Sequence, residues 1–578
     1  MDKKTLLAFL LIAGILMFIP YYYEVVGLAP SPKGGQEASP LPTRDHGESI
    51  TPGYASEPPL WSPPKVGPPS GLHLSSEPVY PTSFQVETLL FSATISSVGG
   101  GTITSFSLKN YFDSDSEYVQ LIRAGVNDLN PLVEFKDISG NSVLLDIPFA
   151  LGAGTYDGQV LSITDREEVV SFLFETTLGT VTKKLTFYPN SYLIGVDVDL
   201  TAISRAEISQ EQFRLVWRGG MLTTESNKKD DIQYFAAHLY QGGEMTKHKG
   251  KSGQTIASTG QTGWTALRSK YFTAALIPIT PSTFGKISTF EERTPNSAVA
   301  DSPPRYSMAV GLSSKKPAHY SLYIGPLKYS RIKALNVELE KTMNFGLSFI
   351  RGISKGILYL LVTMHDYIPN YGVLLIIFSV AVKILVYPLT KKSYQSTKEM
   401  QAVQPLIVAL REKYGGDPQR LNKETMKLYK ERGVNPLGGC LPMLLQMPLL
   451  FAIFTVFRTT IELRGAPFIW WIKDLSAPDT IYQFPGGFSV PIYGDHIAVL
   501  PILMGVSMFV QQKMSGVQAQ PQQKFMMYFM TGFFLLLFNN FPSGLNLYYT
   551  LFNVLTILQQ KYLINPINQP ALPKQPQS

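Results

Sequence analysis

The most restrictive feature of this sequence is an apolar stretch, Gly372 to Thr390, that carries a lysine near its middle. At about 1.5 Å per residue, a helix of this length reaches across a hydrocarbon core of about 30 Å. Lys383 then lies inside the membrane, where a lysine costs roughly 2.5–3.5 kcal/mol on insertion scales. A cost of this size favours a functional side chain that faces a helix bundle or a water-filled cavity.

Two polar neighbours support this interpretation of Lys383. Ser379 and Tyr387 lie four residues before and after it, and residues four apart share one face of a helix. The alternative is a lysine that snorkels to the end of the span at Lys391, only about 12 Å away. Because Ser379 extends the polar face away from that end, we expect a functional group.

Composition places this stretch in a membrane protein with one large soluble insertion. The chain has 578 residues, of which 45% are hydrophobic and 16% charged, and the apolar residues are concentrated at its two ends. The net charge of +7 is no argument for nucleic-acid binding here, because the basic residues matter mainly by the loop that they occupy. The single cysteine, Cys440, excludes an intrachain disulfide.

Residues 1–23 predict an uncleaved transmembrane signal anchor. Lys3 and Lys4 precede a long apolar run, and the positive-inside rule then places the N-terminus in the cytoplasm. A cleaved signal peptide is the alternative, but Pro30 directly follows the only small-residue pattern suited to cleavage. Residues 24–81 are dense in Pro, Gly and Ser, which predicts a flexible tether.

Residues 82–336 predict an all-β domain of about 250 residues, because short alternating runs are separated by Gly, Pro and Asn turns. The clearest runs are Thr102 to Leu108, 192–200, 212–220 and 321–325. Asp113, Asp115 and Glu117 alternate at a turn, but without further ligands they indicate a solvated edge and not a calcium site. We find no catalytic or metal-binding arrangement and expect no cofactor and no metal.

Residues 337–368 predict an amphipathic helix that lies on the membrane surface. Arg351 and Lys355 are four residues apart on one face, and three glycines interrupt the apolar run. A spanning helix at this place would reverse the side of every later loop.

The charge of the loops sets the topology. Ten Lys or Arg and five Asp or Glu lie between Lys391 and Asn435, whereas the loop from Ile461 to His496 has two Lys or Arg. The basic loop should therefore be cytoplasmic, which places the β domain outside and gives six spans with both termini inside. The segments after the surface helix are spans at 369–390, 436–460, 497–513, 525–540 and 545–563, a cytoplasmic hairpin at 391–435, an outer loop at 461–496, and a cytoplasmic loop and tail at 514–524 and 564–578.

The basic loop predicts an antiparallel helical hairpin. Gly415 and Gly416 end a first helix, Asp417 can cap a second one, and Pro418 suits its first turn. Opposed apolar residues on the two helices favour a docking platform, with a solvated loop as the alternative.

The polar residues inside the other spans are neutral, and none of these spans has Asp, Glu or His in its core. They are Gln446, Thr455, Ser507, Gln511, Thr531, Asn546 and Asn553. A proton-coupled transporter needs a titratable relay, and an intramembrane protease needs a catalytic pair of side chains. We also find no internal repeat of the kind that transporters use.

Several runs of residues resemble the YidC family of bacterial membrane protein insertases. They are YPLTKKSYQS at 387–396, NPLGGCLPMLLQMP at 435–448, ELRGAPF at 462–468, PILMGVSMFVQQKM at 501–514 and FPSGLNLYY at 541–549. The resemblance covers about Gly372 to Leu563 closely, and the β domain is similar to the large periplasmic domain of Gram-negative members, a β-supersandwich.

The resemblance implies a polytopic α-helical protein of the bacterial inner membrane, with a five-helix insertase core and a hydrophilic groove. The groove is expected to open to the cytoplasm and to lipid, and to carry a positive residue in its first helix. Lys383 occupies that position, where the family commonly has arginine, so the charge is kept and the planar fork is lost.

Roles for the remaining residues follow from this groove. Lys383 is expected to attract acidic residues of a client, with hydrogen bonds from Ser379, Gln446, Asn546, Tyr549 and Asn553. Phe451 and Phe533 would line the surface along which the client's apolar helix slides. The expected partners are nascent membrane proteins, the ribosome, the Sec translocon and the lipid bilayer, without direct nucleic-acid recognition.

The sequence therefore predicts a non-enzymatic insertase and chaperone for inner-membrane proteins, alone or with the Sec translocon. One alternative is a channel or transporter for small solutes that uses the same polar cavity. Another is a membrane-anchored carbohydrate-binding module built on the β domain. Solute flux would favour the first alternative, and sufficiency of the outer domain alone would favour the second.

Overall fold

The chain divides into a strand-rich unit and a helical unit. The computed structural model describes residues 79–113, 115–123, 129–152, 159–249, 255–290, 304–434, 441–490, 492–514 and 521–563. The strand-rich unit contains the described residues up to Pro326 together with Lys333–Thr342, and the helical unit contains Leu327–Ile332 and the described residues from Met343 onward. The predicted anchor at 1–23, most of the tether and the tail at 564–578 lie outside the described residues.

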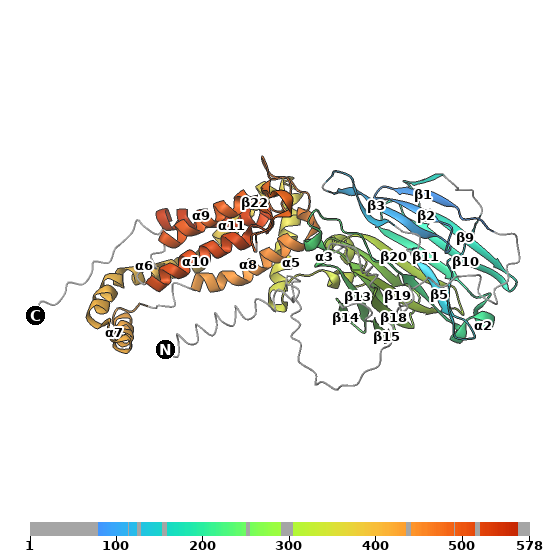
Figure 1. Cartoon of the computed structure of the whole chain (residues 1–578), viewed down its shortest axis with the longest axis horizontal. Coiled ribbons are helices and arrows are strands. Elements are labelled where there is room, and N and C mark those ends of the chain that lie inside the picture. Colours follow the sequence, from blue (N-terminus) through green and yellow to red (C-terminus); the bar gives the residue numbers. More distant parts are fainter. Residues whose placement is uncertain are drawn as a thin grey trace, which may run out of the picture. The chain divides into compact units, whose positions relative to one another are not determined.

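Three sheets form the strand-rich unit, and in the described part all neighbouring strands run antiparallel except β1 and β8 (Figure 1). One sheet has the order β4 (Tyr118–Arg123), β3 (Thr102–Phe112), β2 (Phe91–Ser96), β1 (Ser83–Thr88), β8 (Val160–Ile163). The largest has the order β14 (Glu244–His248), β13 (Ala236–Gln241), β16 (Thr262–Arg268), β17 (Phe272–Pro278), β20 (Ala318–Pro326), β11 (Leu193–Asp199), β10 (Gly179–Phe187), β9 (Glu168–Thr176), β7 (Ala150–Leu151). The third has the order β15 (Thr255–Thr259), β18 (Phe284–Phe290), β19 (Arg305–Ser313), β12 (Gln212–Trp217), β5 (Leu132–Lys136), β6 (Ser142–Leu144).

Short helical turns complete this unit. They are α2 (Ser204–Glu207), η1 (Ser209–Glu211), α3 (Lys228–Ile232) and η2 (Leu339–Thr342). The prediction of a β-rich domain is confirmed, and the four predicted runs lie in β3, β11, β12 and β20. Asp113 behaves as the sequence indicates: its Oδ1 accepts the backbone N–H groups of Asp115 and Glu117, which closes the turn between β3 and β4.

Alternating side chains and glycine turns explain these strands. Along β10, every second residue from Val181 to Phe187 is buried, while Thr182, Lys184 and Thr186 between them are half-buried or exposed. Between β13 and β14, Gly242 and Gly243 both have positive φ, 58° and 84°. A two-residue hairpin turn of this type needs positive φ at both central residues, which glycine adopts without steric cost. Gly242 and Gly243 therefore fix the position of the turn and with it the register of the two strands.

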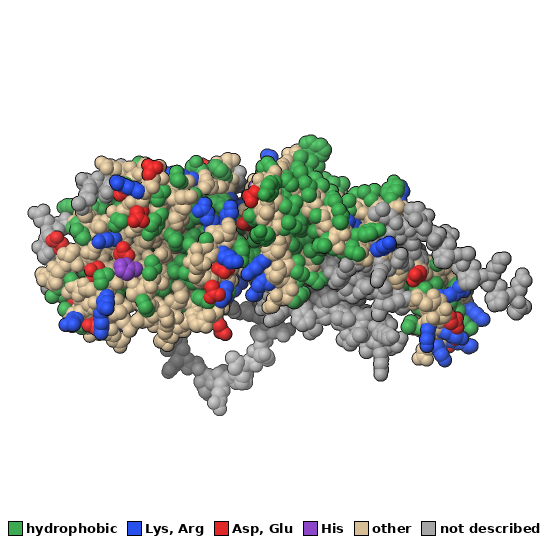
Figure 2. Space-filling view, turned by 180° about the vertical axis from the view of Figure 1, so that it is seen from behind, with side chains coloured by type: hydrophobic (Ala, Val, Ile, Leu, Met, Phe, Trp, Pro, Cys, Tyr) green, Lys and Arg blue, Asp and Glu red, His purple; other side chains and the backbone are tan. Residues whose placement is uncertain are grey.

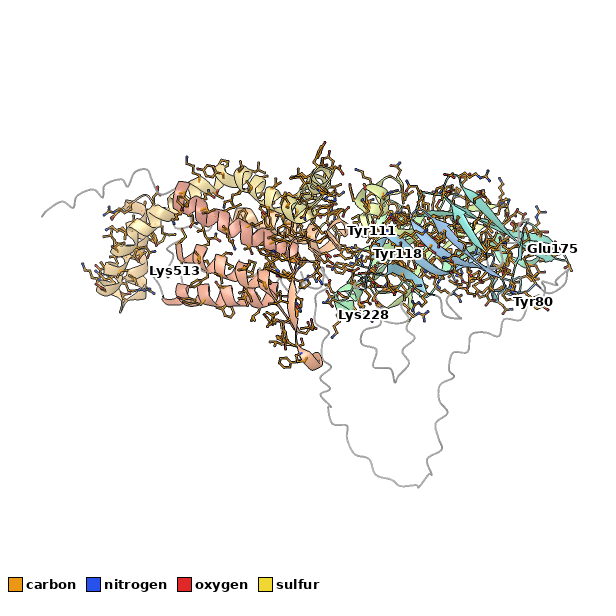
Figure 3. All side chains as sticks on the ribbon, turned by 90° about the horizontal axis from the view of Figure 1, so that it is seen from above. Tyr80, Tyr111, Tyr118, Glu175, Lys228 and Lys513 are labelled. Carbon is orange, nitrogen blue, oxygen red and sulfur yellow. The ribbon has the colours of Figure 1, made fainter. Side chains whose placement is uncertain are left out.

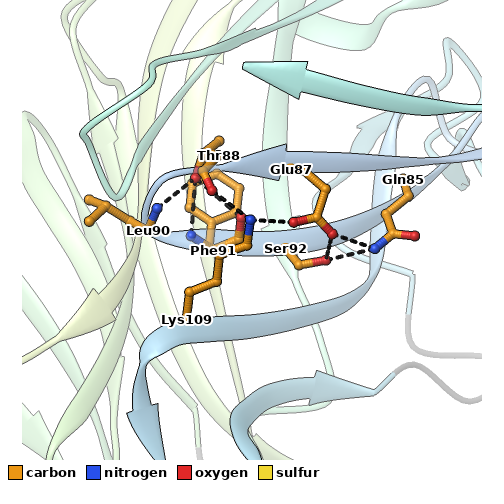
Figure 4. A network of polar contacts seen from close by, with 7 residues as sticks. All are labelled: Gln85, Glu87, Thr88, Leu90, Phe91, Ser92 and Lys109. Carbon is orange, nitrogen blue, oxygen red and sulfur yellow. Dashed lines mark hydrogen bonds and ion pairs between the residues drawn. The ribbon is translucent and has the colours of Figure 1, made fainter. Parts of the chain in front are cut away.

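A polar network joins the first three strands at the surface of their sheet (Figure 4). Lys109 on β3 pairs with the carboxylate of Glu87 on β1 and donates to the carbonyl oxygen of Thr88, 2.8 Å away. Ser92 on β2 donates to the same carboxylate, 2.7 Å away. Because this ion pair is partly exposed, it contributes at most about 1 kcal/mol, and the buried face of the sheet supplies most of its stability.

One inward position of β10 holds a lysine in place of an apolar residue. Lys183 is fully buried, and its Nζ donates to the carbonyl oxygens of Pro131 at 2.7 Å, Gly99 at 2.9 Å and Gly101 at 3.4 Å. Burial lowers the pKa of this amine to about 7. A Cβ at Gly101 would lie 2.5 Å from Phe172, so the backbone can approach the lysine only without a side chain there.

The helical unit contains long helices and several short turns. They are α4 (Tyr329–Lys333), α5 (Ser348–His365), α6 (Tyr371–Tyr414), α7 (Pro418–Glu431), α8 (Leu441–Thr459), η3 (Ile461–Leu463), η4 (Pro485–Gly487), α9 (Val499–Met514), α10 (Pro521–Phe538), α11 (Ser543–Leu558) and the π-helical turn η5 (Gln559–Leu563). A two-stranded hairpin of β21 (Thr480–Gln483) and β22 (His496–Ala498) lies between α8 and α9.

The end of the β domain differs from the predicted boundary at residue 336. The chain passes from the strand-rich unit into the helical unit at Leu327, returns for Lys333–Thr342, and leaves again at Met343. The returning segment is held by the strand-rich unit, because Trp264 Nε1 donates to the carbonyl oxygen of Val337 at 2.8 Å and Arg268 donates to that of Thr342. The predicted surface segment at 337–368 therefore begins inside the strand-rich unit, and its helix α5 starts only at Ser348.

The helix α6 crosses the predicted boundary between the span at 369–390 and the hairpin at 391–435. It is one helix of 44 residues, with Pro388 and Pro405 inside it. No glycine or turn sequence interrupts the stretch, and near Pro388 the hydroxyl of Thr390 donates to the carbonyl oxygens of Val386 and Tyr387. A proline alone therefore does not end this helix.

The second half of the predicted hairpin contains α7. Asp417 Oδ1 accepts the backbone N–H groups of Gln419 and Arg420, and α7 begins at Pro418. Gly433 follows the helix with a φ of 66°. Val403, Ile407 and Val434 form a small core between the two arms.

The number of six spans stays a prediction. Among the described residues, Tyr371–Pro388 is the helical stretch that is long and apolar enough to cross a membrane by itself. Shorter apolar helices occupy Met447–Thr459 and Val499–Met514.

The helices after α5 form a bundle around α11 (Figure 1). α11 packs against α6, α8 and α9, α9 also packs against α10, and α5 packs against α8 and α6. We call the end at which α6 begins the outer end, and the end near α7 and Lys513 the inner end (Figure 3). Apolar side chains cover much of the visible bundle, whereas Lys and Arg gather on the hairpin (Figure 2).

The buried lysine of β10 gives a stability prediction. Lys183→Met removes the donor for three buried carbonyl oxygens, and we expect the free energy of unfolding of the strand-rich unit to fall by about 2 kcal/mol. Urea unfolding, followed by the fluorescence of the buried Trp217 and Trp264, measures the change. The control is Lys184→Met on the exposed face of the same strand, and equal stability of the two variants would contradict the structural role of Lys183.

Candidate functional site

Lys383 is directed from α6 into the bundle. Its side chain is 8% exposed, and Nζ donates to Oγ1 of Thr556 on α11 at 2.6 Å. The ammonium also lies 4.3 Å from the centre of the Phe552 ring, within the range of a cation–π contact. The side chain therefore points to α11 and not along α6 towards Lys391, which is the geometry expected for a group that faces the bundle interior.

The partner of Lys383 is itself held in place. The hydroxyl of Thr556 donates to the carbonyl oxygen of Phe552 at 2.7 Å, which leaves its lone pairs for Lys383. Among the residues that the structure describes, no Asp or Glu forms an ion pair with Lys383. The bundle thus contains a buried ammonium group with one neutral acceptor and one aromatic ring.

A polar stripe continues from this position along α11. Asn546, Tyr549, Asn553 and Thr556 are spaced by three, four and three residues, so they share one face of the helix. Asn553 Nδ2 donates to Oγ of Ser507 on α9 at 3.2 Å. The stripe is therefore in contact with both neighbouring helices, α6 at Thr556 and α9 at Asn553.

Several buried polar atoms near this stripe have no hydrogen-bond partner among the described residues. They include Asn546 Oδ1, the hydroxyl oxygens of Tyr548 and Tyr549, and both amide atoms of Gln559. Buried polar groups in proteins are almost always hydrogen-bonded to protein or to water. These atoms are therefore positions where water, or a polar segment of another chain, can bind.

The other predicted site residues are placed differently. Ser379 is fully buried, and its hydroxyl donates to the carbonyl oxygen of Leu375 in its own helix at 2.6 Å. Asn546 Nδ2 donates to the carbonyl oxygen of Phe538 at 3.1 Å and so holds the turn between α10 and α11. It lies ten residues from Thr556, about 15 Å along the helix, and is not brought together with Lys383. The side chain of Gln446 lies outside the described part.

Phe451 and Phe533 are half-buried on α8 and α10. Phe533 stacks on Phe529, with 6.3 Å between ring centres. Among the described residues, α8 and α10 do not pack along each other. The two phenylalanines therefore lie on helices that are not packed along each other.

Sequence reasoning missed Thr556 and Phe552, which are the contacts of Lys383. The sequence does contain a pattern that includes Thr556, because Thr556 continues the spacing of Asn546, Tyr549 and Asn553 on one face of α11. A threonine in an apolar helix is usually satisfied by its own backbone, so the pattern alone gave no reason to select it.

Side-chain hydrogen bonds connect distant segments at the outer end of the bundle. Asp479 Oδ2 accepts the backbone N–H groups of Val499 and Leu500 at 3.1 and 2.8 Å, and so caps α9 from a distant loop. Burial raises the pKa of this carboxyl. Asn539 accepts the backbone N–H of Ala498 at 3.1 Å and donates to the carbonyl oxygen of His496 at 2.8 Å. These contacts tie the loop between α8 and α9 to the turn between α10 and α11.

Comparison with known proteins shows the family to which the chain belongs. Residues 83–360 match the family model of the YidC periplasmic domain, and residues 363–570 match the model of the 60Kd inner membrane protein. A membrane protein insertase YidC from Chlorobium limicola is 38% identical over 85% of this chain and 84% of its own length. The chain belongs to the YidC family. It is therefore a membrane protein insertase of the inner membrane with a periplasmic domain, and its substrates are nascent membrane proteins.

Other YidC proteins show similar agreement. The insertase YidC from Chloroherpeton thalassium is 37% identical over 83% of this chain and 82% of its own length. A crystal structure of active YidC insertase with the first transmembrane domain resolved covers 85% of this chain and 95% of its own, with 17% identity and a TM-score of 0.36. The two family models and the identities of the YidC relatives confirm the sequence resemblance to the YidC family.

Proposed function

We propose that this YidC protein draws polar segments of its clients into a hydrated groove between α6, α8, α9, α10 and α11, with Lys383 as the attracting charge. The observation that carries the proposal is the buried ammonium of Lys383, which has Thr556 and Phe552 as contacts. The protein acts as an insertase and chaperone without enzymatic chemistry, alone or with the Sec translocon.

The cost of an intramembrane charge supports a hydrated groove. A lysine at the centre of a span costs roughly 2.5–3.5 kcal/mol in lipid, and one hydroxyl acceptor replaces only part of its hydration. Water beside the polar atoms of α11 that have no described partner would lower this cost, because it could form hydrogen bonds with these atoms and with the ammonium of Lys383. An acidic client tail would meet the same positive potential in a site where water screens it less than in bulk.

A groove that reaches halfway also shortens the path of the client. Unpaired backbone groups cost several kcal/mol each in the hydrocarbon region, so a polar tail crosses more easily where part of the membrane thickness is wet. The network around Asp479 and Asn539 closes the outer end, which supports a groove open towards the inner end. Gln446, Asn546, Tyr549 and Asn553 would offer hydrogen bonds to the tail, and so would the oxygen of Ser379.

The apolar part of a client would leave the groove sideways. α8 and α10 are not packed along each other in the described residues, and they carry the half-buried Phe451 and Phe533. A client helix that slides between them exchanges one apolar contact for another, so its transfer into lipid meets no large barrier. Six spans, cytoplasmic termini and a β-supersandwich in the periplasm complete the proposed architecture.

The basic hairpin would receive clients from the ribosome. It has its own core at Val403, Ile407 and Val434, so its charged side chains are presented by a folded element. Lys423, Lys427 and Lys430 are exposed on α7, and a basic folded surface suits the phosphate-rich exterior of a ribosome without reading any nucleotide sequence.

Substitutions at Lys383 test the groove. Lys383→Arg keeps the positive charge and should retain insertion of a client with an acidic translocated tail, whereas Lys383→Leu should lose most of it. Lipid cost alone predicts the opposite order, because leucine removes an intramembrane charge and should leave the protein at least as stable. Protease protection of the client in proteoliposomes measures insertion, and thermal unfolding in detergent measures stability. A stable and fully active Lys383→Leu protein would disprove the role of the charge.

Charge removal on the hairpin tests ribosome docking. Changing Lys423, Lys427 and Lys430 to Gln should lower co-sedimentation with ribosomes severalfold, and the remaining binding should weaken with salt because the Debye length is about 8 Å at physiological ionic strength. The matched control changes Glu424 and Glu431 on the same helix to Gln, which should leave binding intact. Equal ribosome binding by both variants would show that the basic face of α7 is not the docking surface.

A further inference from the structure

The loop between α8 and α9 exposes an unusual set of apolar side chains, which we call the apolar crown. Its members are Ile469, Trp470, Ile481, Tyr482, Phe488 and Ile492. Trp470 is 84% exposed, and the stretch from Thr480 to Tyr493 contains no Asp, Glu, Lys or Arg. Single exposed apolar residues need no explanation, but six on one loop indicate an interaction surface.

The backbone of the crown is strained at two points. Trp470 has a φ of 53° and Ile492 a φ of 72°. The left-handed region is unfavourable for bulky side chains and above all for a β-branched one. Among the described non-glycine residues with positive φ, these two are the large apolar ones, and both are exposed. Strain of this kind persists only where surrounding contacts impose it.

Hydrogen bonds beneath the crown impose the strain. The turn at Trp470 is closed by the N–H of Ile472, which donates to the carbonyl oxygen of Ile469 at 3.1 Å. The turn at Ile492 is held by Asn540, whose Nδ2 donates to the carbonyl oxygen of Ile492 at 2.8 Å. Asn540 comes from the turn before α11, so the bundle itself fixes the direction in which the crown points.

The crown lies at the outer end of the bundle (Figures 1 and 3). The β21–β22 hairpin projects sideways from the outer end of the bundle, across the direction of the helices (Figures 1 and 3), and apolar side chains cover the projecting part (Figure 2). Phe468, next to the crown, packs so closely on Gly372 at the start of α6 that a Cβ there would lie 2.0 Å from its ring. The crown is therefore level with the beginning of the span.

We propose that the apolar crown inserts into the outer leaflet of the membrane and anchors the outer end of the bundle. Tryptophan and tyrosine favour the headgroup level of a bilayer, and isoleucine and phenylalanine favour the adjoining acyl chains. α5 adds exposed Phe349 and Tyr359, and the turn after it adds exposed Tyr367, so lipid contact could also come from this part of the helical unit. A partner protein would need an apolar surface complementary in shape to this projecting loop, which has no charged residue between Thr480 and Tyr493. Lipid acyl chains adapt to the shape of the loop.

Three isoleucines of similar exposure allow a matched experiment in the full chain. Ile492 in the crown is 59% exposed, Ile279 in the strand-rich unit 66%, and Ile384 on α6 69%. In a Cys440→Ser background, each is changed singly to cysteine, labelled with an environment-sensitive fluorophore, and reconstituted in vesicles of phosphatidylethanolamine and phosphatidylglycerol. Iodide on both sides of the bilayer reports exposure to water, and lipids with a doxyl group near the headgroup or deep in the chain report depth.

The probe at Ile492 should be quenched most by the shallow doxyl group, and severalfold less by iodide than the probe at Ile279. The probe at Ile384 should be quenched by the deep group. A probe at Trp470, in the other strained turn, should follow Ile492. Strong iodide quenching at both crown positions would overturn the proposal, and so would protection from iodide without doxyl quenching, because protein and not lipid would then cover the crown.

Discussion

The hydrogen bond from Lys383 to Thr556 is the interaction on which the account of this protein depends. It joins the one described helix that is long and apolar enough to cross a membrane by itself to the central helix of the bundle. A charge at this place is costly in lipid, and its acceptor is neutral. The bundle therefore keeps a positive potential that is not cancelled by a carboxylate among the described residues, which is what a site for acidic client tails requires.

The two ends of the helical unit are built differently, and the proposed groove would take its direction from this asymmetry. At the outer end, Asp479 and Asn539 use side-chain hydrogen bonds to fasten the loop after α8 against α9 and the turn before α11. At the inner end, a basic hairpin extends the first span by several turns of the same helix α6. The polar stripe of α11 runs from Thr556, beside Lys383, towards the turn that precedes α11 at the outer end.

Much of this arrangement could be predicted from the sequence. The apolar stretch with one lysine, the alternating strands and the basic loop each follow from periodicity or charge, and the Asp417 cap follows from a local rule. The family followed from runs of residues around the spans. These features are local, so each can be read without knowledge of the partner that it meets in space.

The features that could not be predicted are those that depend on packing between distant segments. The sequence does not distinguish Thr556 from other threonines, because its contact with Lys383 depends on the packing of α6 against α11. The sequence also does not show that Lys183 is buried, because its hydrogen-bond acceptors, the carbonyl oxygens of Gly99 and Pro131, lie far away in the chain. The hydrogen bond from the amide of Asn546 to the carbonyl oxygen of Phe538 likewise forms only once α10 and α11 have folded back on each other. The sequence also did not decide whether α6 is one helix or two, because proline weakens a helix without always ending it.

Complementary charge exchange at Lys383 tests the central claim most directly. The measurement is insertion of two matched clients, one with an acidic and one with a basic translocated tail, by the wild-type protein and by Lys383→Glu in proteoliposomes. The account predicts that Lys383→Glu loses the acidic client and gains insertion of the basic one, because the attraction depends on the sign of the charge. If Lys383→Glu inserts both clients as the wild type does, or loses both to the same degree, the charge of Lys383 does not recruit the tail.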